Sequence, residues 1–185
     1  MRDGACISFA NVDLARAGAQ VFAGLSCELV ERRIGLIGNN GSGKSSFLRL
    51  CNGLLLPDSG RVIVHGLETR SARARLPEIV GFLFQNPDHQ IIFPTVGEEI
   101  GYNLRLRGMD GAAVNETVTK LLASLGYVDW FDRPVHDLSE GQKQLVCILS
   151  ATISTPRVLL LDEPFASLDI PSRHSLMRKL DELAQ

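Results

Sequence analysis

Gly38-Asn39-Asn40-Gly41-Ser42-Gly43-Lys44-Ser45 decides the fold, because it matches the phosphate-binding pattern G-x-x-x-x-G-K-[ST] at every fixed position. The apolar run Arg33–Ile37 before it predicts a buried strand, and Ser46–Cys51 after it predicts a helix. Glycines let such a loop point successive backbone N–H groups at an anion, and the helix N-terminus adds its positive dipole end. Strand, loop and helix together favour a nucleotide-binding site over a glycine-rich surface turn that carries a lysine by chance.

Two side chains of this loop have predicted tasks of their own. Lys44 would reach the outer phosphates, and the Ser45 hydroxyl would ligate Mg²⁺. The remaining residues would surround the phosphates with backbone N–H groups and short side chains. They are Gly38, Asn39, Asn40, Gly41, Ser42, Gly43 and Ser46.

Composition limits the classes of protein to consider. The chain has 185 residues, of which 45% are hydrophobic, so it can bury the core of a single domain. Its formal net charge of -2 gives no overall basic field, so we expect no nucleic-acid partner. The cysteines contain no C-x-x-C pair, which argues against a zinc site or a disulfide framework and favours a reducing compartment. We find no leader sequence, and no apolar run approaches the roughly 18 residues that span a bilayer.

The order of apolar patterns predicts an α/β fold. Residues 5–37 have the broken alternation of antiparallel strands, with a turn near Gly18. From Thr95 the apolar spacing becomes helical, and Ser139 with Gln142 has the spacing of a capping box at the start of another helix. Arg157–Leu161 is apolar without alternation, which is typical of a strand inside a parallel sheet covered by helices on both faces.

Two carboxylates follow that last strand directly. Ligands of open α/β folds bind at the carboxyl edge of the sheet, where Asp162 and Glu163 would then lie. Asp162 would hold the Mg²⁺ shell through a water, and Glu163 would orient or deprotonate the water that attacks the γ-phosphorus. We expect this edge and the phosphate loop to share one Mg²⁺. The alternative is that Asp-Glu-Pro only begins a polar loop.

Five motifs in one order resemble an ABC-type ATPase domain over nearly the whole chain. They correspond to that family's Walker A, Q-loop, signature, Walker B with catalytic glutamate, and D-loop, and here they are Gly38–Ser45, Gln85, Leu138–Gln142, Val158–Asp162 with Glu163, and Ser167–Asp169. The stretch Phe84–Gln90, followed by Phe93–Ile100, is similar to the ATPase subunits of energy-coupling-factor importers, which take up vitamins and transition-metal ions such as cobalt and nickel.

The resemblance implies a P-loop NTPase fold. It has a parallel core sheet, an N-terminal antiparallel β region and an inserted helical subdomain. We expect a single domain over 1–185, with the helical subdomain at about 88–150. The implied cofactors are ATP and Mg²⁺, and the implied activity is ATP hydrolysis that powers import through a membrane complex.

Family members work as two ATPase domains facing head to tail, so the resemblance implies a second copy or a paralogue as partner. Ser139, Gly141 and Gln142 would then bind the nucleotide held by the facing domain, although the spacing alone favours an ordinary helix N-cap. Gln85 would sense Mg²⁺ and the attacking water, or it is a polar strand end. Residues 86–107 would dock a transmembrane subunit at the cytoplasmic face of the membrane, or their apolar stripe only packs on its own domain.

Three departures from the family pattern affect these expectations. Glu140 replaces the usual glycine of the signature, and we expect its carboxylate to point away from the nucleotide. Arg16 occupies the place of an aromatic that stacks on adenine, which a guanidinium can also do. The family also has a switch histidine on a strand beyond the D-loop, and none of the four histidines follows such a strand after Asp169.

The missing histidine leads us to interpret the chain as a C-terminally truncated ATPase domain. We expect it to bind nucleotide weakly and to hydrolyse it poorly, whereas the parent protein would be active. Two other functions stay open at this point. One is a soluble ABC-type ATPase that is not tied to transport, and the other is a non-catalytic nucleotide-binding module.

Overall fold

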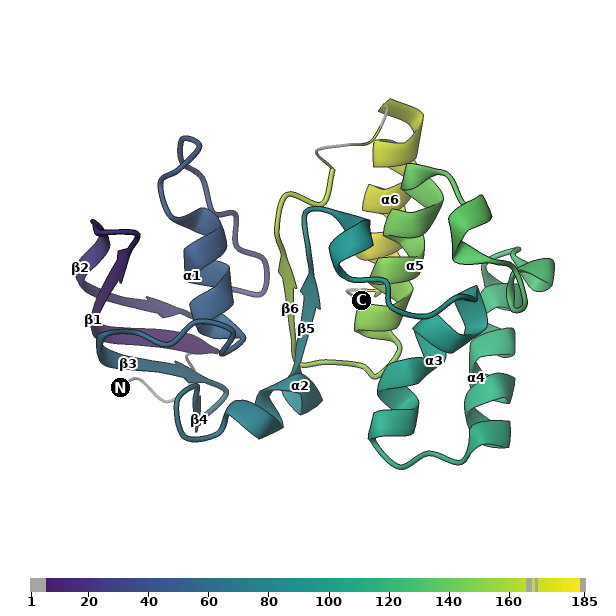
Figure 1. The fold of residues 1–185 in the computed structure, drawn as a ribbon, viewed down its shortest axis with the longest axis horizontal. Helices are drawn as coiled ribbons and strands as arrows, with labels where there is room; N and C mark the ends of the chain where they lie inside the picture. The colour runs from purple at the N-terminus through teal and green to yellow at the C-terminus, as the bar shows by residue number, and fades with distance from the viewer. Residues whose placement is uncertain (1–5, 166–167, 169, 184–185) are drawn as a thin grey trace. The chain divides into compact units, whose positions relative to one another are not determined.

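The computed structural model describes residues 6–165, 168 and 170–183, and the chain divides into two compact units, Met1–Val80 and Gly81–Gln185 (Figure 1). The first unit contains an antiparallel sheet with the strand order β2-β1-β3-β4. Its strands are β1 (Ile7–Arg16), β2 (Ala19–Leu29), β3 (Ser59–Val64) and β4 (Leu67–Glu68). The antiparallel N-terminal region that the sequence predicts is therefore confirmed.

Helix α1 (Lys44–Cys51) packs on this sheet through aromatic rings. The ring of Phe47 stacks on Phe9 with 4.3 Å between centroids, and it meets Phe22 edge-on at 6.3 Å. Aromatic pairs at these distances add to the free energy gained from burying the rings. The phosphate loop is thus followed by a helix that is held against a rigid sheet.

The strand predicted over Arg33–Ile37 is wrong for this structure. The backbone at 34–39 has no regular secondary structure, and the side chains of Ile34 and Ile37 are 50% and 94% exposed. A strand needs a neighbour that pairs with its N–H and C=O groups, and in the part of the chain that the structure describes this run belongs to neither sheet. Apolar composition indicated a buried strand but could not supply the pairing partner.

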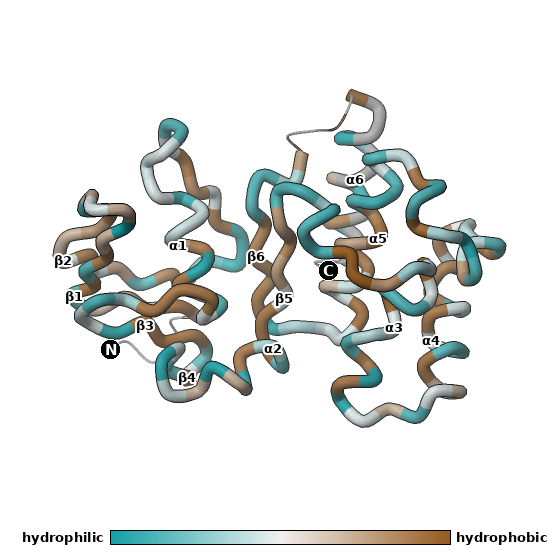
Figure 2. The backbone as a smooth tube through the Cα atoms, viewed as in Figure 1, coloured by the Kyte–Doolittle hydropathy of each residue, from teal (hydrophilic) through white to brown (hydrophobic). Residues whose placement is uncertain are grey.

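The second unit contains the parallel sheet. Strand β5 (Val80–Leu83), which begins at the boundary of the two units, pairs with β6 (Val158–Leu161), and the N–H of Asp162 donates to the carbonyl of Leu83 at 3.0 Å. Apolar residues run along both strands (Figure 2). The strand predicted at Arg157–Leu161 is confirmed, but its predicted position inside the sheet is not, because among the described residues β6 pairs with β5 alone.

Helices make up most of the second unit. Its described α-helices are α3 (Val96–Leu106), α4 (Gly111–Ser124), α5 (Glu140–Thr152) and α6 (Ile170–Leu183), and it has 3-10 turns at Pro87–His89, Val128–Trp130 and Val135–Asp137. The first unit ends with a 3-10 turn at Arg73–Arg75 and the short helix α2 (Leu76–Ile79). Thr95 and Asp110 cap the N-termini of α3 and α4 by accepting hydrogen bonds from Glu98 and Ala112. Among the described residues no helix has both the length and the apolar character that a membrane crossing requires.

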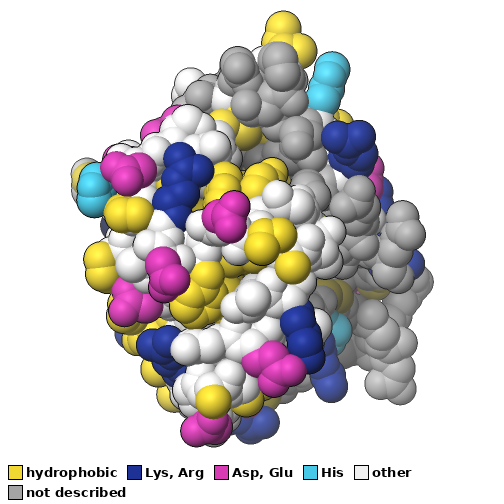
Figure 3. Space-filling model, turned by 90° about the vertical axis from the view of Figure 1, so that its right-hand side faces the viewer, with side chains coloured by type: hydrophobic (Ala, Val, Ile, Leu, Met, Phe, Trp, Pro, Cys, Tyr) yellow, Lys and Arg dark blue, Asp and Glu magenta, His cyan; other side chains and the backbone are white. Residues whose placement is uncertain are grey.

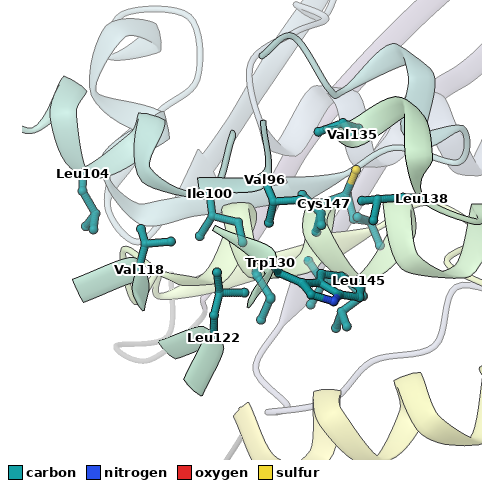
Figure 4. Close-up of a cluster of buried hydrophobic side chains, with 14 of the residues drawn as sticks. Val96, Ile100, Leu104, Val118, Leu122, Trp130, Val135, Leu138, Leu145 and Cys147 are labelled. Atoms are coloured by element: carbon teal, nitrogen blue, oxygen red, sulfur yellow. The ribbon is translucent and has the colours of Figure 1, made fainter. Parts of the chain in front are cut away.

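The core of the second unit lies between α3, α4 and α5 (Figure 4). Val96 and Ile100 from α3 face Val118 and Leu122 from α4, and all four side chains are completely buried. The apolar residues that recur at helical spacing in the sequence therefore form the buried face of each helix. Gly101 lets α3 and α4 approach closely, because a Cβ there would lie 2.6 Å from Cγ1 of Val114.

Candidate functional site

The phosphate loop depends on glycines at three of its positions. Gly41 and Gly43 have φ angles of +81° and +94°, which side chains other than glycine rarely adopt. A Cβ on Gly43 would also lie 2.8 Å from Cγ1 of Val21, and one on Gly38 would lie 2.6 Å from Oγ of Ser42. The loop can therefore curl only with this pattern of glycines.

The loop ends at the N-terminus of α1. Gly43 is the N-cap residue and has no side chain that could accept a hydrogen bond from the first turn. Lys44 turns back over the loop, where its Nζ donates to the carbonyl oxygens of Gly38 and Asn39 at 2.8 and 3.0 Å. The ammonium group thus already lies where oxygen acceptors are in reach.

The other predicted contacts of the first unit lie at or near its surface. Asn39, Asn40 and Ser42 are exposed, and Ser45 and Ser46 are half-buried in the first turn of α1. Arg16 is exposed at the end of β1, where it pairs with Ala19 across the turn. These residues are accessible to a ligand, and their contacts with a nucleotide remain predictions.

In the second unit, Gln85 and Glu163 meet. Because β5 and β6 are parallel, the segments that follow them leave the sheet at the same edge. Nε2 of Gln85 donates to Oε2 of Glu163 at 2.9 Å, although the two residues are 78 positions apart in the sequence. The structure therefore brings together the two side chains that were predicted to act on the attacking water.

The backbone at the acidic end of β6 has an uncommon conformation. Glu163 has a φ of +48°, in the left-handed region that residues other than glycine, Asn and Asp seldom occupy. Asp162 beside it is 4% exposed, and its N–H is held by the carbonyl of Leu83. A residue keeps such a conformation where contacts with its neighbours hold it, and conformations of this kind are common at functional sites.

The start of α5 has the predicted capping box. Oγ of Ser139 accepts from the N–H of Gln142, and Oε1 of Gln142 accepts from the N–H of Ser139 at 3.0 Å. Glu140 is exposed, and Gly141 is half-buried. The reading of Ser139 as a helix N-cap is thus confirmed, while its contact with a nucleotide stays a prediction.

An ion pair joins α5 to the segment after Gln85. Nζ of Lys143 lies 2.8 Å from Oδ1 of Asp88, and this hydrogen bond raises the pKa of the Lys143 ammonium. The raised pKa reflects the attraction between this ammonium and the carboxylate of Asp88. The pair therefore ties the signature helix to the Gln85 segment by a contact that the sequence analysis did not identify.

Two glutamines near the site were also missed. Oε1 of Gln90 accepts from the N–H of Phe84 at 3.1 Å, and its Nε2 donates to the carbonyl of Cys147 at 3.0 Å. Gln144 is 1% exposed and donates to the carbonyl of Pro164 at 3.3 Å. A polar residue directly before the apolar stripe of α5 was a signal for Gln144, whereas nothing in the local pattern marked Gln90.

The remaining predictions concern the D-loop, the histidine on the last helix and the shared Mg²⁺. Ser167 and Asp169 of the predicted D-loop lie outside the described residues, and Leu168 between them is buried. His174 is exposed on α6, as expected for a residue that faces solvent. The phosphate loop belongs to the first unit and the acidic strand end to the second, so the sharing of one Mg²⁺ stays a prediction.

Comparisons with known proteins agree with this set of motifs. The family model described as ABC transporter matches residues 24–166. The biotin transport ATP-binding protein BioM of Rhodobacter capsulatus is 46% identical over 179 residues, which cover 97% of this chain and 76% of that protein. The protein of the same name from Rhizobium etli is 39% identical over 168 residues, which cover 88% of this chain and 75% of that protein.

A solved structure has the same fold. It is cbiO1 from Clostridium perfringens, described as part of the ABC transporter complex cbiONQ, and it matches with a TM-score of 0.83 and 27% identity over 98% of this chain and 74% of that one. The family model and the relatives each cover most of the chain, and they agree with the phosphate loop and the acidic strand end. This chain therefore belongs to the ABC transporter family, among its ATP-binding subunits whose ATPase activity is coupled to transport.

Proposed function

We propose that this chain hydrolyses ATP to power the import of a vitamin or a transition-metal ion through a membrane complex, with biotin as the first substrate to test. Two relatives are named for biotin transport, and the structural neighbour is described as part of a transporter complex. The observation that carries the hydrolytic part is the hydrogen bond between Gln85 and Glu163 at the carboxyl edge of the parallel sheet.

Glu163 is the proposed catalytic base. Its carboxylate would orient the attacking water and take up a proton from it as the water oxygen bonds to the γ-phosphorus, while the bond from that phosphorus to the bridging oxygen breaks and ADP leaves. The Gln85 amide donates to one carboxylate oxygen and leaves the other for the water. Gln85 would therefore hold the base in place. It would also couple the binding of the water and Mg²⁺ to the rest of the protein.

The first unit would bind the nucleotide. The N–H groups of the loop and of the first turn of α1 would surround the phosphates, with Lys44 on the outer ones. Phosphate oxygens are charged acceptors, so they would compete well with the two loop carbonyls that now accept from Lys44. Arg16 would stack on the adenine, since the face of a guanidinium packs well on an aromatic ring.

The residues available for Mg²⁺ fit its chemistry. The proposed ligands are the hydroxyl of Ser45, the amide oxygen of Gln85 and, through a water, the carboxylate of Asp162. Mg²⁺ prefers hard oxygen ligands and is usually held by one or two carboxylates together with substrate phosphates. When bound, the ion would neutralise charge on the β- and γ-phosphates.

Two kinds of protein partner follow from this proposal. Ser139, Gly141 and Gln142 would contact a nucleotide held by a second ATPase domain, which is either another copy or a paralogue. A membrane subunit would hold the protein at the cytoplasmic face of the membrane and dock on residues 86–107. The space-filling view from the side of α4 shows exposed apolar side chains with acidic and basic groups around them (Figure 3). We further propose that 1–185 forms one functional domain, with a helical subdomain at about 88–150.

The decisive experiment measures ATP turnover of Glu163→Gln in the whole protein, assembled with its membrane partners. We expect turnover to fall about 100-fold or more, because the amide cannot accept the proton, while ATP still binds. Uptake of labelled biotin into cells would fall with it.

The matched control is Glu116→Gln, since Glu116 is an exposed carboxylate on α4 that pairs with Lys120. This variant should keep wild-type turnover and uptake. If Glu163→Gln hydrolyses ATP as fast as Glu116→Gln, the catalytic role of Glu163 is wrong. If turnover falls but biotin uptake never depends on this protein, another vitamin or a metal ion is the substrate.

A further inference from the structure

Gln144 is a buried polar residue whose hydrogen bonding is incomplete. Only 1% of it is exposed, and the next residues on its helix, Leu145 and Val146, are apolar core residues. Its Nε2 donates to the carbonyl of Pro164 at 3.3 Å, while its Oε1 is buried without a hydrogen-bond partner among the described residues. Proteins pair nearly all such groups, so an amide here costs stability that an apolar side chain of the same shape would not.

The acceptor of that bond lies next to the proposed catalytic base. Pro164 follows Glu163, whose backbone is in the left-handed region with a φ of +48°. A residue keeps this unfavourable conformation only where neighbouring contacts hold it. The contact from Gln144 holds the carbonyl of Pro164, one residue after Glu163, and the contact from Gln85 holds the carboxylate itself.

Helix α5 also contacts the segment that contains Gln85, the partner of Glu163. This contact is made by the backbone of α5 at residue 147, close to one turn beyond Gln144. The carbonyl of Cys147 accepts from Gln90, which in turn accepts from the N–H of Phe84, next to Gln85. Helix α5 thus contacts both segments that meet in the Gln85–Glu163 hydrogen bond.

We propose that Gln144 is a positioning residue for ATP hydrolysis, which holds the backbone after Glu163 so that the carboxylate faces the attacking water. This inference rests on the proposed role of Glu163. This positioning role also explains the incomplete hydrogen bonding of Gln144, because the residue is retained for the placement of the base at a cost in stability. A side chain that serves only the core would have no need of the amide.

The test replaces Gln144 with methionine, which has a similar length and no amide. In the whole protein with its partner subunits, kcat should fall about 10- to 100-fold, which is typical when a reacting group is misplaced by about 1 Å. KM for ATP should stay within about two-fold of wild type, because the residues that bind the phosphates are untouched. Tm should stay the same or rise, because removal of the unpaired buried oxygen outweighs the loss of the donor to Pro164, a residue that is only half-buried.

Ser150→Ala is the matched control on the same helix. Ser150 is also buried, and its Oγ donates to a backbone carbonyl, that of Glu99, at 3.0 Å. This variant loses one complete hydrogen bond, which joins α5 to α3 and not to the segment after Glu163, so its Tm should fall by about 2–4 °C. Its kcat should stay within about two-fold of wild type. The two variants thus separate stability from positioning.

Each outcome is decisive. If Gln144→Met keeps its kcat, or if it fails to fold or loses stability as Ser150→Ala does, Gln144 is a structural residue and the inference is wrong. Glu163→Gln, measured in parallel, distinguishes the catalytic role of Glu163 from the positioning role of Gln144. Full turnover in Glu163→Gln would remove the proposed catalytic role, whereas lost turnover there with normal kcat in Gln144→Met would remove only the positioning role.

Discussion

At the scale of single residues, Lys44 shows how the first unit is prepared for an anion. Its ammonium donates to the carbonyls of Gly38 and Asn39, so the side chain is already folded over the loop. A phosphate would need to exchange these neutral acceptors for charged ones without a large movement of the chain. Such preorganisation lowers the entropy lost on binding.

Replacing Lys44 with alanine should weaken ATP binding by at least about ten-fold, because a hydrogen bond between charged groups contributes roughly 1.5–3 kcal/mol. Titration of a fluorescent ATP analogue measures the affinity. Lys120→Ala is the control, since this lysine is exposed and pairs with Glu116 on α4. Equal affinity of the two variants would contradict the assignment of the phosphate loop.

At the scale of elements, α5 joins the functional groups of the second unit. Its N-terminus carries the capping box, Lys143 in its first turns pairs with Asp88, and Gln144 and Cys147 contact the segments after β6 and β5. A helix is stiff along its axis, so these contacts keep fixed positions relative to one another. Changes at the start of α5 should therefore be felt both in stability and at the site.

Ser139→Ala should lower the free energy of unfolding by about 1 kcal/mol, because the N–H of Gln142 loses its acceptor at the N-cap. Ser139→Thr should keep most of this stability. Urea denaturation of both variants gives the difference directly. Ser124→Ala serves as the comparison, since that hydroxyl donates to the carbonyl of Leu121 within α4. A Ser139→Ala protein no less stable than this one would argue against the cap.

At the scale of the whole molecule, the loop between η2 (Pro87–His89) and α3 presents an apolar side chain on a fixed backbone. The carboxylate of Glu99, which is 3% exposed, accepts from the N–H groups of Ile92 and Phe93 at 2.9 and 3.0 Å. The side chain of Ile92 is nevertheless 68% exposed. A buried carboxylate that orders a loop with an exposed apolar residue supports the proposal that a membrane subunit docks on 86–107.

Ile92→Asp should therefore reduce the recovery of the membrane partner in pull-downs from detergent-solubilised membranes, by about ten-fold or more if Ile92 lies at the centre of the contact. Val128→Asp is the matched control, since Val128 is 64% exposed and lies outside 86–107. Undiminished recovery with Ile92→Asp, or an equal loss with both variants, would count against this docking surface.

Sequence alone determined the features that depend on neighbouring residues. The glycine pattern of the phosphate loop, the helix that follows it, the capping box at Ser139 and the strand before Asp162 are all present as predicted. In each case a few consecutive residues contain both the groups that interact and the backbone preference that brings them together.

Only the tertiary structure decided which distant segments meet. Gln85 and Glu163 are 78 residues apart, and no local pattern showed that their side chains would form a hydrogen bond. The run Arg33–Ile37 has the composition of a strand, yet in the described part of the chain it pairs with none. The proposed role of Gln144 depends on its hydrogen bond to the carbonyl of Pro164, which is 20 positions away in the sequence. The physical reason is that strand pairing and buried polar contacts need partners, and the positions of partners are set by the packing of the whole chain.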